Sequence, residues 1–403
     1  MNQPSAPRPL QGIRVLEVGQ LLAGPFAGCI LAYYGAEVIK VEPPGDGDPL
    51  RKWRELDAEG TSFWWRSLAR NKKCVTADLR TSAGCSLVRR LAEKSDVLLE
   101  NFRPGVMEKW GLGPASFTGS NPGLIYARIS GYGQDGPYAA KPGFASVCEG
   151  IGGFRHINGY PGDPPVRPNI SMGDTLAGLH TALGILMACV YRLNNPAAKG
   201  QIVDTALYES VFNLLEGIVP EFAGAGVVRE PSDSTITGIV PTNTYRCADG
   251  KFIIIGANGD SIFKRLCQAM GRHDMAEDQR MADNRGRVAH EAQIDSVIEH
   301  WCSLLDSVTV LGLLEQARVP SGPIYNVADM FADEHFKARG LFEEVQVNGA
   351  PLKIPALVPK LSATPGRSDW AGPGVGAFNR EVYQGLLGLT DEQLSTLQTD
   401  GVI

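Results

Sequence analysis

One carboxylate of the sequence stands where it could take part in covalent chemistry. Asp174 follows Ser-Met-Gly and opens an apolar stretch whose leucines recur at helical spacing. A carboxylate there can accept backbone N–H groups as a helix cap, and the residues by themselves favour that structural role. The positive end of a helix would also keep a carboxylate ionised, as a nucleophile or a base requires. The two roles are compatible, and the residues alone leave both open.

Two further candidates precede Asp174 in a segment rich in Gly and Pro. His156 and Arg167 could each pair with a substrate carboxylate, since Arg offers two donors in a fixed fork. Each could equally bind a nearby backbone carbonyl, which is the commoner case.

Earlier parts of the chain hold candidates for phosphate binding. Asn101-Phe102-Arg103 directly follows an expected strand, where open α/β folds usually bind ligands, although a plain loop would look the same. A group of cations could meet phosphates, but such a run more often forms a solvated face. Its members are Lys40, Arg51, Lys52, Arg54, Arg66, Arg70, Lys72 and Lys73.

Several common kinds of site are not supported. The stretch EVGQLLAGPFAG lacks G-x-G-x-x-G, and the chain has no Walker sequence and no G-x-S-x-G elbow. The six histidines form no HxxxH or HExxH pair, so a metal site has little support.

Alternating strands and helices would position these residues. Five short runs rich in Val, Ile or Leu predict strands: Ile13–Val18, Glu37–Glu42, Lys73–Leu79, Asp96–Phe102 and Leu124–Ser130. Helical patterns between and after them cover Phe26–Tyr34, Ala83–Lys94 and Val106–Trp110, then a long helix from about Asp174. Alternation at this spacing predicts a parallel sheet with crossover helices. We expect a further strand at Gln201–Leu207 and a helix at Tyr208–Ala223.

The long helix carries an apolar stripe that we expect to be its buried face. Its members are Leu176, Leu179, Leu183, Leu186, Val190 and Leu193. Because Leu176–Val190 contains His180 and two glycines, we interpret it as a buried helix rather than a membrane span.

Length and composition bound the class of protein. The chain has 403 residues and 43.3 kDa, more than one compact core usually holds, and a formal charge of −6. A negative chain has no general attraction to nucleic acid. The eight cysteines include no CxxC pair and are typical of reduced thiols in a cytoplasmic protein. The N-terminal MNQPSAPRPLQG lacks the apolar region of a signal peptide.

A second lobe begins after a change in composition. The stretch 224–237 is rich in Gly, Ser, Thr and Pro and is typical of a linker. Beyond it we expect a strand at Lys251–Ala257 and helices near 260–271, 288–304 and 308–317. The tail holds a β-like segment, Ala350–Leu361, and a helix from about Asn379.

Eight segments carry a family resemblance. They are LQGIRVLEVGQLLAGPFAG, LAYYGAEVIKVEPPGDGDPLRKW, RNKKCVTADLRTSAG, DVLLENFRPGVMEKWGLG, ISGYGQDGP, GDTLAGLHTALGIL, KGQIVDTALYES and VPSGPIYNVADMF. In this order, and over essentially the whole chain, they resemble the class III CoA-transferase family, also called the CaiB/BaiF or formyl-CoA transferase family.

The resemblance implies a fold and an assembly. It implies a Rossmann-like large α/β domain built from both chain ends, a smaller α/β domain between them, and an interlocked homodimer. The large domain would cover 1–223 and, after the linker 224–237 and a small domain at 238–330, resume at 331–403.

The resemblance also implies a chemistry. Asp174 matches the family's nucleophilic aspartate, which would exchange CoA between an acyl-CoA and a free acid through an aspartyl anhydride and an aspartyl-CoA thioester. CoA thioesters would be substrates, and no metal or permanently bound cofactor is expected. CoA contacts carry over to Leu21, Leu22, Ala23, Ala77, Arg80, Asn101, Phe102, Arg103 and Lys109. The sequence departs from the family at Pro43, where members carry Arg, and at Ala145, where an acidic residue is common.

Alternatives and substrates follow from the same comparison. The α-methylacyl-CoA racemases of this fold use a histidine ahead of the aspartate, but Phe144 occupies that position here and cannot transfer protons. A non-catalytic CoA-binding module would need Asp174 to be only a cap. The stretches HING, DPPVRPNISMGD and GIVPTNTY resemble members that use succinyl-CoA and dicarboxylic acceptors, such as succinate–hydroxymethylglutarate CoA-transferase. We therefore expect a succinyl-CoA donor, a dicarboxylate acceptor held by His156 or Arg167, and no nucleic acid or membrane partner.

Overall fold

The computed structural model describes residues 7–403, which fall into two compact units. Unit 1 comprises the N-terminal part up to Phe154, then Pro168–Glu216 and His335–Ile403. Unit 2 comprises Arg155–Arg167 and Gly217–Glu334, whereas the boundaries expected from the sequence place 155–167 and 217–223 in the large domain. The first six residues of the N-terminal segment, which we expect not to be a signal peptide, lie outside the described residues.

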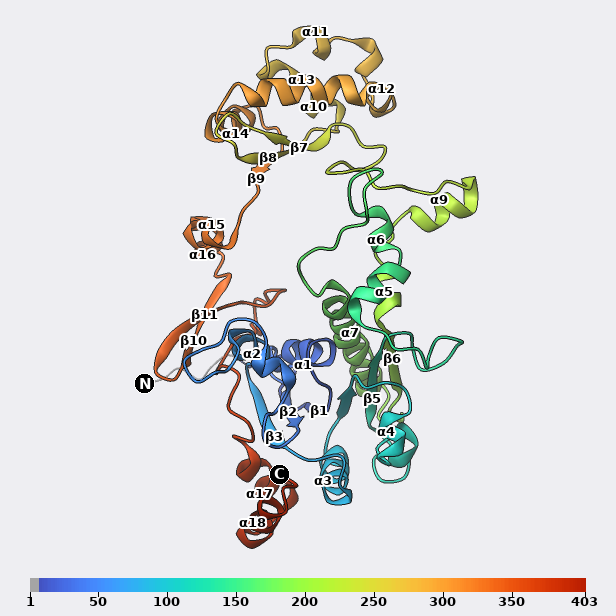
Figure 1. The fold of residues 1–403 in the computed structure, drawn as a ribbon, viewed down its shortest axis with the longest axis vertical. Helices are drawn as coiled ribbons and strands as arrows, with labels where there is room; N and C mark the ends of the chain where they lie inside the picture. The colour runs from blue at the N-terminus through green and yellow to red at the C-terminus, as the bar shows by residue number, and fades with distance from the viewer. Residues whose placement is uncertain (1–6) are drawn as a thin grey trace. The chain divides into compact units, whose positions relative to one another are not determined.

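Unit 1 is built on a six-stranded parallel sheet (Figure 1). Its strands are β1 (Arg14–Glu17), β2 (Glu37–Glu42), β3 (Lys72–Thr76), β4 (Val97–Glu100), β5 (Ile125–Ser130) and β6 (Ile202–Ala206). Their order is β3-β2-β1-β4-β5-β6, the order of doubly wound α/β folds. The inner strands are buried on both faces, so they are mostly apolar and lack a strict alternation of apolar and polar residues. The mixed α/β fold with a parallel sheet is confirmed.

Helices cover both faces of the sheet. On one face, α1 (Ala23–Tyr33) and α7 (Met172–Asn194) share a hydrophobic cluster with the strands. On the other, α3 (Ser82–Ala92) packs with the C-terminal α17 (Asn379–Leu387), so both ends of the chain contribute to unit 1. The remaining helices that lie in it wholly or mainly are α2 (Phe63–Leu68), α4 (Val106–Lys109), α5 (Ala145–Ile151), α8 (Leu207–Phe212), α16 (Glu334–Ala338) and α18 (Asp391–Thr399), with the 3-10 turns η1 (Pro49–Lys52) and η2 (Pro114–Phe117).

The prediction that the leucine stripe of α7 is its buried face is wrong. Leu179, Leu183 and Leu193 are 46%, 50% and 72% exposed in the single chain. The buried residues of α7 are mostly small: Gly173, Ala177, Gly178, Thr181, Ala182, Ile185, Ala188 and Cys189. The reason is the close approach of α1, because a Cβ added at Gly178 would lie 2.8 Å from the carbonyl oxygen of Ala23. Mostly small residues thus face the core, together with Ile185, and most of the large apolar ones face outward.

The helix predicted at Tyr208–Ala223 is in fact two helices. α8 ends at Phe212, and α9 (Ile218–Ala225) begins in unit 2. Between them Glu216 adopts a left-handed backbone with φ +42°, which no continuous helix allows.

The tail of unit 1 contains a β-hairpin. β10 (Phe342–Val347) pairs antiparallel with β11 (Ala350–Pro355) through the turn Asn348-Gly349. Both turn residues have positive φ, +52° and +80°, as the tight hairpin turn favoured by Asn-Gly requires.

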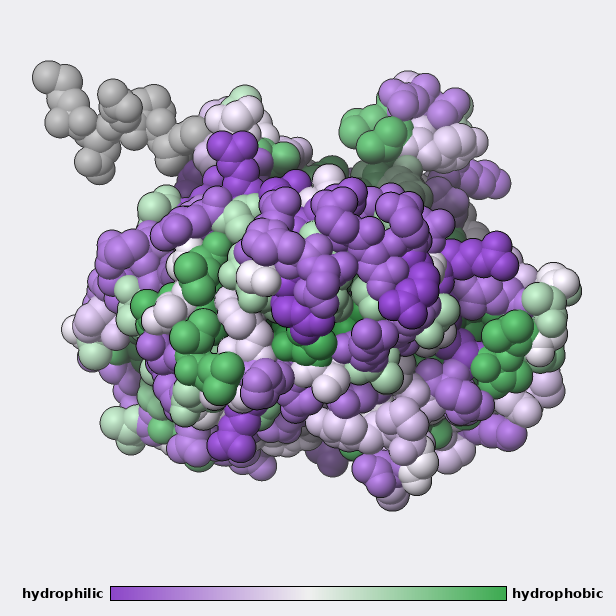
Figure 2. Space-filling model, turned by 90° about the horizontal axis from the view of Figure 1, so that it is seen from above, coloured by the Kyte–Doolittle hydropathy of each residue, from purple (hydrophilic) through white to green (hydrophobic). Residues whose placement is uncertain are grey.

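Unit 2 has its own sheet and core. The antiparallel strands β7 (Thr242–Arg246), β8 (Phe252–Gly256) and β9 (Ser321–Pro323) lie in that order. The helices are α9, α10 (Asp260–Ala269), α11 (His273–Ala276), α12 (Asn284–Ala289), α13 (Glu291–Ser303), α14 (Ser307–Gln316) and α15 (Val327–Ala332), with the 3-10 turn η3 (Gln279–Met281), while α6 (Phe154–Ile157) begins at the unit boundary. The view in Figure 2 is mainly hydrophilic, with hydrophobic residues in small separate groups.

Candidate functional site

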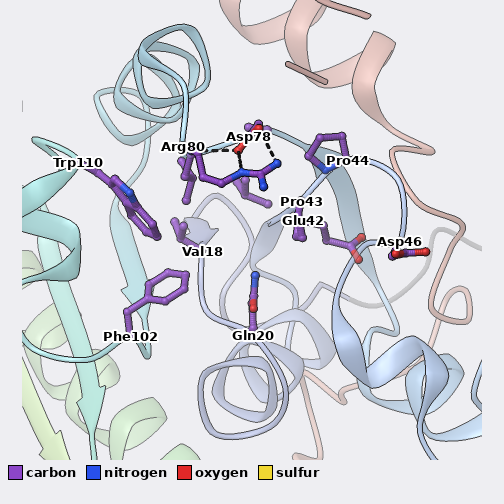
Figure 3. Close-up of a pocket in the computed structure, with 13 residues that line it drawn as sticks. Val18, Gln20, Glu42, Pro43, Pro44, Asp46, Asp78, Arg80, Phe102 and Trp110 are labelled. Carbon is purple, nitrogen blue, oxygen red and sulfur yellow. Dashed lines mark hydrogen bonds and ion pairs between the residues drawn. The ribbon is translucent and has the colours of Figure 1, made fainter. Parts of the chain in front are cut away.

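A cavity of about 420 Å³ lies at the carboxyl ends of the central strands (Figure 3). Strands β1 and β4 are neighbours in the sheet although β2 and β3 lie between them in sequence, so the chain reverses direction across the sheet here. Open α/β sheets bind ligands at such a switch point. The lining residues are Val18, Gln20, Val41, Glu42, Pro43, Pro44, Asp46, Ala77, Asp78, Leu79, Arg80, Phe102 and Trp110.

Two features of the lining suit a nucleotide. The Arg80 guanidinium is 84% exposed and donates two hydrogen bonds of 2.8 and 2.9 Å to Asp78, which holds the pKa of that carboxyl below its usual range. Across the cavity, the rings of Phe102 and Trp110 meet edge to face with centroids 5.1 Å apart (Figure 3). A cation and aromatic surfaces together can hold the phosphates and the base of a nucleotide.

The structure brings only some of the predicted CoA-contact residues into this cavity. Ala77, Arg80 and Phe102 line it, as does Pro43, the position that departs from the family. Leu21, Leu22 and Ala23 form the turn into α1 beside it, while Arg103 and Lys109 are exposed on the loop after β4 and at the end of α4.

Asn101, a predicted CoA contact, binds the turn after β1 in the structure. Its side chain accepts a hydrogen bond of 2.7 Å from the Gln20 N–H and donates one of 2.8 Å to the Gln20 carbonyl. Asn101 therefore joins the loops after β1 and β4 and is not among the lining residues.

Most of the early cations serve neither expected purpose. Lys40, Arg51, Arg66, Arg70 and Lys72 are at most 6% exposed, so a solvated face and a phosphate site are both wrong for them. Their partners are carboxylates and backbone carbonyls and, for Arg70, also the hydroxyls of Ser67 and Ser368, because buried charges require polar partners. Only Lys52 and Arg54 of the group are exposed, and Lys73 is partly buried.

A charge cluster with two buried members, Arg128 and Glu100, and one exposed member, Glu108, supports the aromatic wall. Arg128 of β5 donates to Glu100 of β4 and to Glu108 of α4, each at 2.7 Å. Glu100 also accepts the Phe102 N–H at 2.7 Å. Burial raises the pKa of Glu100 to about 7, although Arg128 acts in the opposite direction. The cluster fixes both elements that carry the Phe102–Trp110 pair.

Asp174 lies in the first turn of α7 but is not its cap. Ser171 occupies the N-cap position, so the prediction that Asp174 is the cap is wrong. Asp174 is the third residue of the helix. An acidic residue there is still stabilised as an anion by the helix terminus. The buried Glu149 of α5 accepts the N–H of Gly173 at 3.4 Å. Burial, with the negative charge of Asp174, raises the pKa of the Cys148 thiol to about 11.

The position of the racemase histidine is beside this turn. Phe144 caps α5 and is 68% exposed, and its neighbour Ala145 contacts Gly173, whose added Cβ would lie 3.3 Å from the Ala145 Cβ. The sequence position at which the racemases carry a histidine therefore holds a side chain that cannot exchange protons.

The two predicted acceptor residues belong to unit 2, whereas Asp174 belongs to unit 1. His156 lies 3.5 Å from Glu230, and both side chains are largely exposed. Arg167 ends the first stretch of unit 2.

Some lining residues were missed from the sequence. Gln20 and Trp110 each lie next to a predicted residue, Leu21 and Lys109. The end of β1 would have suggested Gln20, whereas Trp110 follows α4 and is not marked by a strand end. Glu149 had no sequence signal, because nothing marks a glutamate in a short helix as buried.

Two further features concern metal binding and the length of the apolar helices. Within residues 7–403, no group of three or more His, Cys, Asp or Glu side chains is arranged to hold a metal ion. In the same range, α7 and the bent pair α13–α14 are long and apolar enough to span a membrane, a criterion that core helices also meet.

Known proteins resemble this chain over most of its length. The model of CoA-transferase family III matches residues 10–379. The succinyl-CoA–D-citramalate CoA-transferase of Chloroflexus aurantiacus is 46% identical over 100% of both chains. The alpha subunit of succinyl-CoA–L-malate CoA-transferase from Chloroflexus aurantiacus is 40% identical over 98% of this chain and 92% of its own. The crystal structure of a CaiB/BaiF family protein from Brucella suis matches with a TM-score of 0.83 at 34% identity, over 94% of this chain and 100% of that one. The resemblance inferred from the sequence is confirmed.

Proposed function

Because the chain belongs to CoA-transferase family III, we propose that it moves CoA from succinyl-CoA to a free dicarboxylate through covalent intermediates on Asp174. The protein is a CoA-transferase, and CoA thioesters are its substrates. Our proposal concerns the identity of the CoA donor, the identity of the acceptor and the residues that act on them.

The proposed exchange has four balanced steps. An Asp174 oxygen attacks the succinyl thioester carbonyl, and the C–S bond breaks to give a mixed anhydride and CoA thiolate. The thiolate attacks the Asp174 carbonyl and releases succinate, leaving an aspartyl-CoA thioester. The acceptor carboxylate displaces the thiolate to form a second anhydride, and the thiolate then attacks the acceptor carbonyl and regenerates Asp174. Splitting the exchange in this way replaces one difficult step by easier ones.

The position of Asp174 is the observation that carries this proposal. It lies in the first turn of a 23-residue helix, partly exposed, so its oxygens can reach a ligand while the helix terminus favours the anion.

We propose that the cavity at the carboxyl ends of β1–β4 binds the nucleotide end of CoA. Arg80 would bind phosphate at the mouth, and Phe102 and Trp110 would form the wall against the base. Arg103 and Lys109, exposed nearby in sequence, would add charge for the remaining phosphates.

The names of the relatives direct the choice of acceptor. They are described as acting on citramalate and malate, both 2-hydroxydicarboxylates. We propose that His156 or Arg167 pairs with the acceptor's distal carboxylate, as an Arg fork does well. If Arg167→Ala left the acceptor KM unchanged, Arg167 would not have this role.

The experiment offers purified protein succinyl-CoA and a panel of mono- and dicarboxylates, and follows CoA esters by chromatography. We expect new esters with dicarboxylates, and citramalyl- or malyl-CoA among them. In Asp174→Asn, transfer should fall by about 10³-fold or more while the helix survives by circular dichroism, because nucleophile removal is severe and Asn fits a first turn. Succinyl-CoA left intact with every acid would contradict the donor, and an active Asn variant would contradict the nucleophile.

We also propose that two copies form an interlocked homodimer in the cytoplasm, without a membrane or nucleic acid partner. Leu183, Met187 and Val190 of α7 are 50%, 61% and 56% exposed in the single chain, and a continuous apolar stripe of this kind is normally covered. All eight cysteines are free thiols, which suits a reducing compartment. Sedimentation at about twice the chain mass of 43.3 kDa would support the dimer, and a monomer would exclude it.

A further inference from the structure

The turn after β1 is held almost entirely by side chains. Gly19, Gln20 and Leu21 lie between β1 and α1. Four consecutive polar backbone groups there, from the Gly19 carbonyl to the Leu21 N–H, have side-chain partners and no backbone partner among the hydrogen bonds described. Lys40 donates to the Gly19 carbonyl, and Asn101 binds both the N–H and the carbonyl of Gln20. The Leu21 N–H donates to both oxygens of Asp48, at 3.1 and 3.2 Å.

Two of these three side chains form a fully buried ion pair. Lys40 lies 2.9 Å from Asp48 and 3.3 Å from Glu17, and all three side chains have no exposed area. Asp48 additionally accepts the Leu50 N–H at 2.9 Å. These partners fix the positions of the Lys40 ammonium and the Asp48 carboxylate, because displacing either group would leave a buried charge unpaired.

The turn needs this support because its backbone is unfavourable. Leu21 adopts a left-handed conformation with φ +63°, which a side chain with a Cβ rarely takes. The contacts with Asp48 select that conformation. In it, the Gln20 side chain lines the cavity (Figure 3), and α1 begins two residues after Leu21.

We propose that Lys40, Asp48 and Asn101 are positioning residues that preset the Gly19–Leu21 turn for CoA, and that Gln20 contacts the nucleotide end of CoA through its side-chain amide. This inference rests on the proposed function, since it assumes that CoA occupies the cavity. Lys40 was expected among cations on a solvated face, and neither Asp48 nor Gln20 was among the predicted site residues.

The test measures binding apart from stability. Asp48→Asn keeps the shape of the side chain but removes the charge that pairs with Lys40 and turns one acceptor of the Leu21 N–H into a donor. Asp57→Asn is the matched control: the Asp57 side chain is also buried and pairs with an arginine, Arg66, at 2.7 Å, but the hydrogen bonds described for it go to Arg66 and to the backbone of Glu59 and Thr61 and not to the Gly19–Leu21 turn. Calorimetric titration with CoA should show Kd raised roughly 10- to 100-fold in Asp48→Asn, on the scale of a misplacement by about 1 Å, and within about twofold in the control.

Two readouts separate positioning from general damage. Asp48→Asn should raise KM for succinyl-CoA far more than it lowers kcat. It should impair turnover of succinyl-pantetheine, which lacks the nucleotide, far less than turnover of succinyl-CoA. Equal losses with both substrates would overturn the proposal. Gln20→Ala, at the contact itself, should reproduce the selective loss with CoA, and an unchanged Kd would remove its assigned contact.

A second variant covers the case in which Asp48→Asn fails to fold. Asn101→Asp is partly exposed and isosteric; it still accepts the Gln20 N–H but sets a carboxylate oxygen against the Gln20 carbonyl. CoA binding should weaken here too, and folded Asn101→Asp with wild-type Kd would overturn the proposal. Because CoA binding is measured directly, this test does not depend on CoA transfer. If the wild-type protein bound CoA but transferred none, only the proposed function would be refuted.

Discussion

Replacing Lys72 by Met should destabilise unit 1 strongly, although Lys72 lies at an edge strand of the sheet. Its ammonium is fully buried, 2.7 Å from the Glu17 carboxylate and 2.7 Å from the carbonyl oxygen of Pro25 in α1. The pair therefore links β3 to β1 and to the helix that covers them. Met fills a similar volume, so the change mainly removes the charge.

The magnitude follows from burial. Removing one partner of a buried pair costs about 3–5 kcal/mol, because the other charge is left without compensation. Lys40 at 3.3 Å remains beside Glu17 and places the expected loss toward the lower end. For a unit of this size about 2 °C of melting temperature corresponds to each kcal/mol, so we expect a fall of roughly 6–8 °C.

The adjacent residue supplies a matched control. Lys73 lies on the same strand and also pairs with carboxylates, Glu37 at 2.7 Å and Glu381 at 2.8 Å, but its side chain is 24% exposed. Lys73→Met should cost at most about 1 kcal/mol, as partly exposed pairs usually do. Melting followed by circular dichroism and by calorimetry compares the two variants. If Lys72→Met melted no lower than Lys73→Met, the buried pair would not stabilise the sheet as reasoned.

Three further predictions concern pH, binding and metals. Burial raises the pKa of Glu100 to about 7, so the folded state holds a proton that the unfolded state releases near pH 4.5. The free energy of unfolding should therefore fall by up to roughly 3 kcal/mol as the pH rises from 4.5 through 7. Glu100→Gln should flatten that part of the melting profile, and parallel profiles would refute the assignment. Arg80→Ala should raise KM for succinyl-CoA about tenfold with little change in kcat, on the scale of one charge-assisted hydrogen bond; an unchanged KM would exclude its phosphate contact. Incubation with EDTA should leave the transfer rate unchanged, and inactivation reversed by added metal would contradict a reaction that needs none.

Local patterns were sufficient to predict the sheet. The strand predicted at Glu37–Glu42 has the same bounds in the structure, and those at Ile13–Val18 and Leu124–Ser130 differ by two residues or fewer at each end. Buried parallel strands are continuous apolar runs, so the signal lies within the segment itself. The hairpin signal at Asn348-Gly349 was also present, but only the strand after it was recognised.

Features that depend on distant partners could not be predicted. Lys40 and Lys72 look like surface cations until β1 and the loop after β2 bring Glu17 and Asp48 to them. The outward face of α7 was likewise unpredictable, because helical spacing shows that a face is apolar but not what covers it. For the site, family resemblance supplied Asp174, whereas the geometry identified Gln20 and the role of Asn101.

Isotope transfer tests the covalent role of Asp174 most directly. The enzyme would be incubated with succinyl-CoA and an acceptor dicarboxylate labelled with ¹⁸O in its carboxylates, and the peptide containing Asp174 would be weighed after many turnovers. In the proposed steps the acceptor leaves one carboxylate oxygen on Asp174 each time its anhydride is cleaved, so that peptide should gain mass from ¹⁸O and no other peptide should. Turnover that leaves the Asp174 peptide unlabelled, or that labels a different residue, would contradict the account.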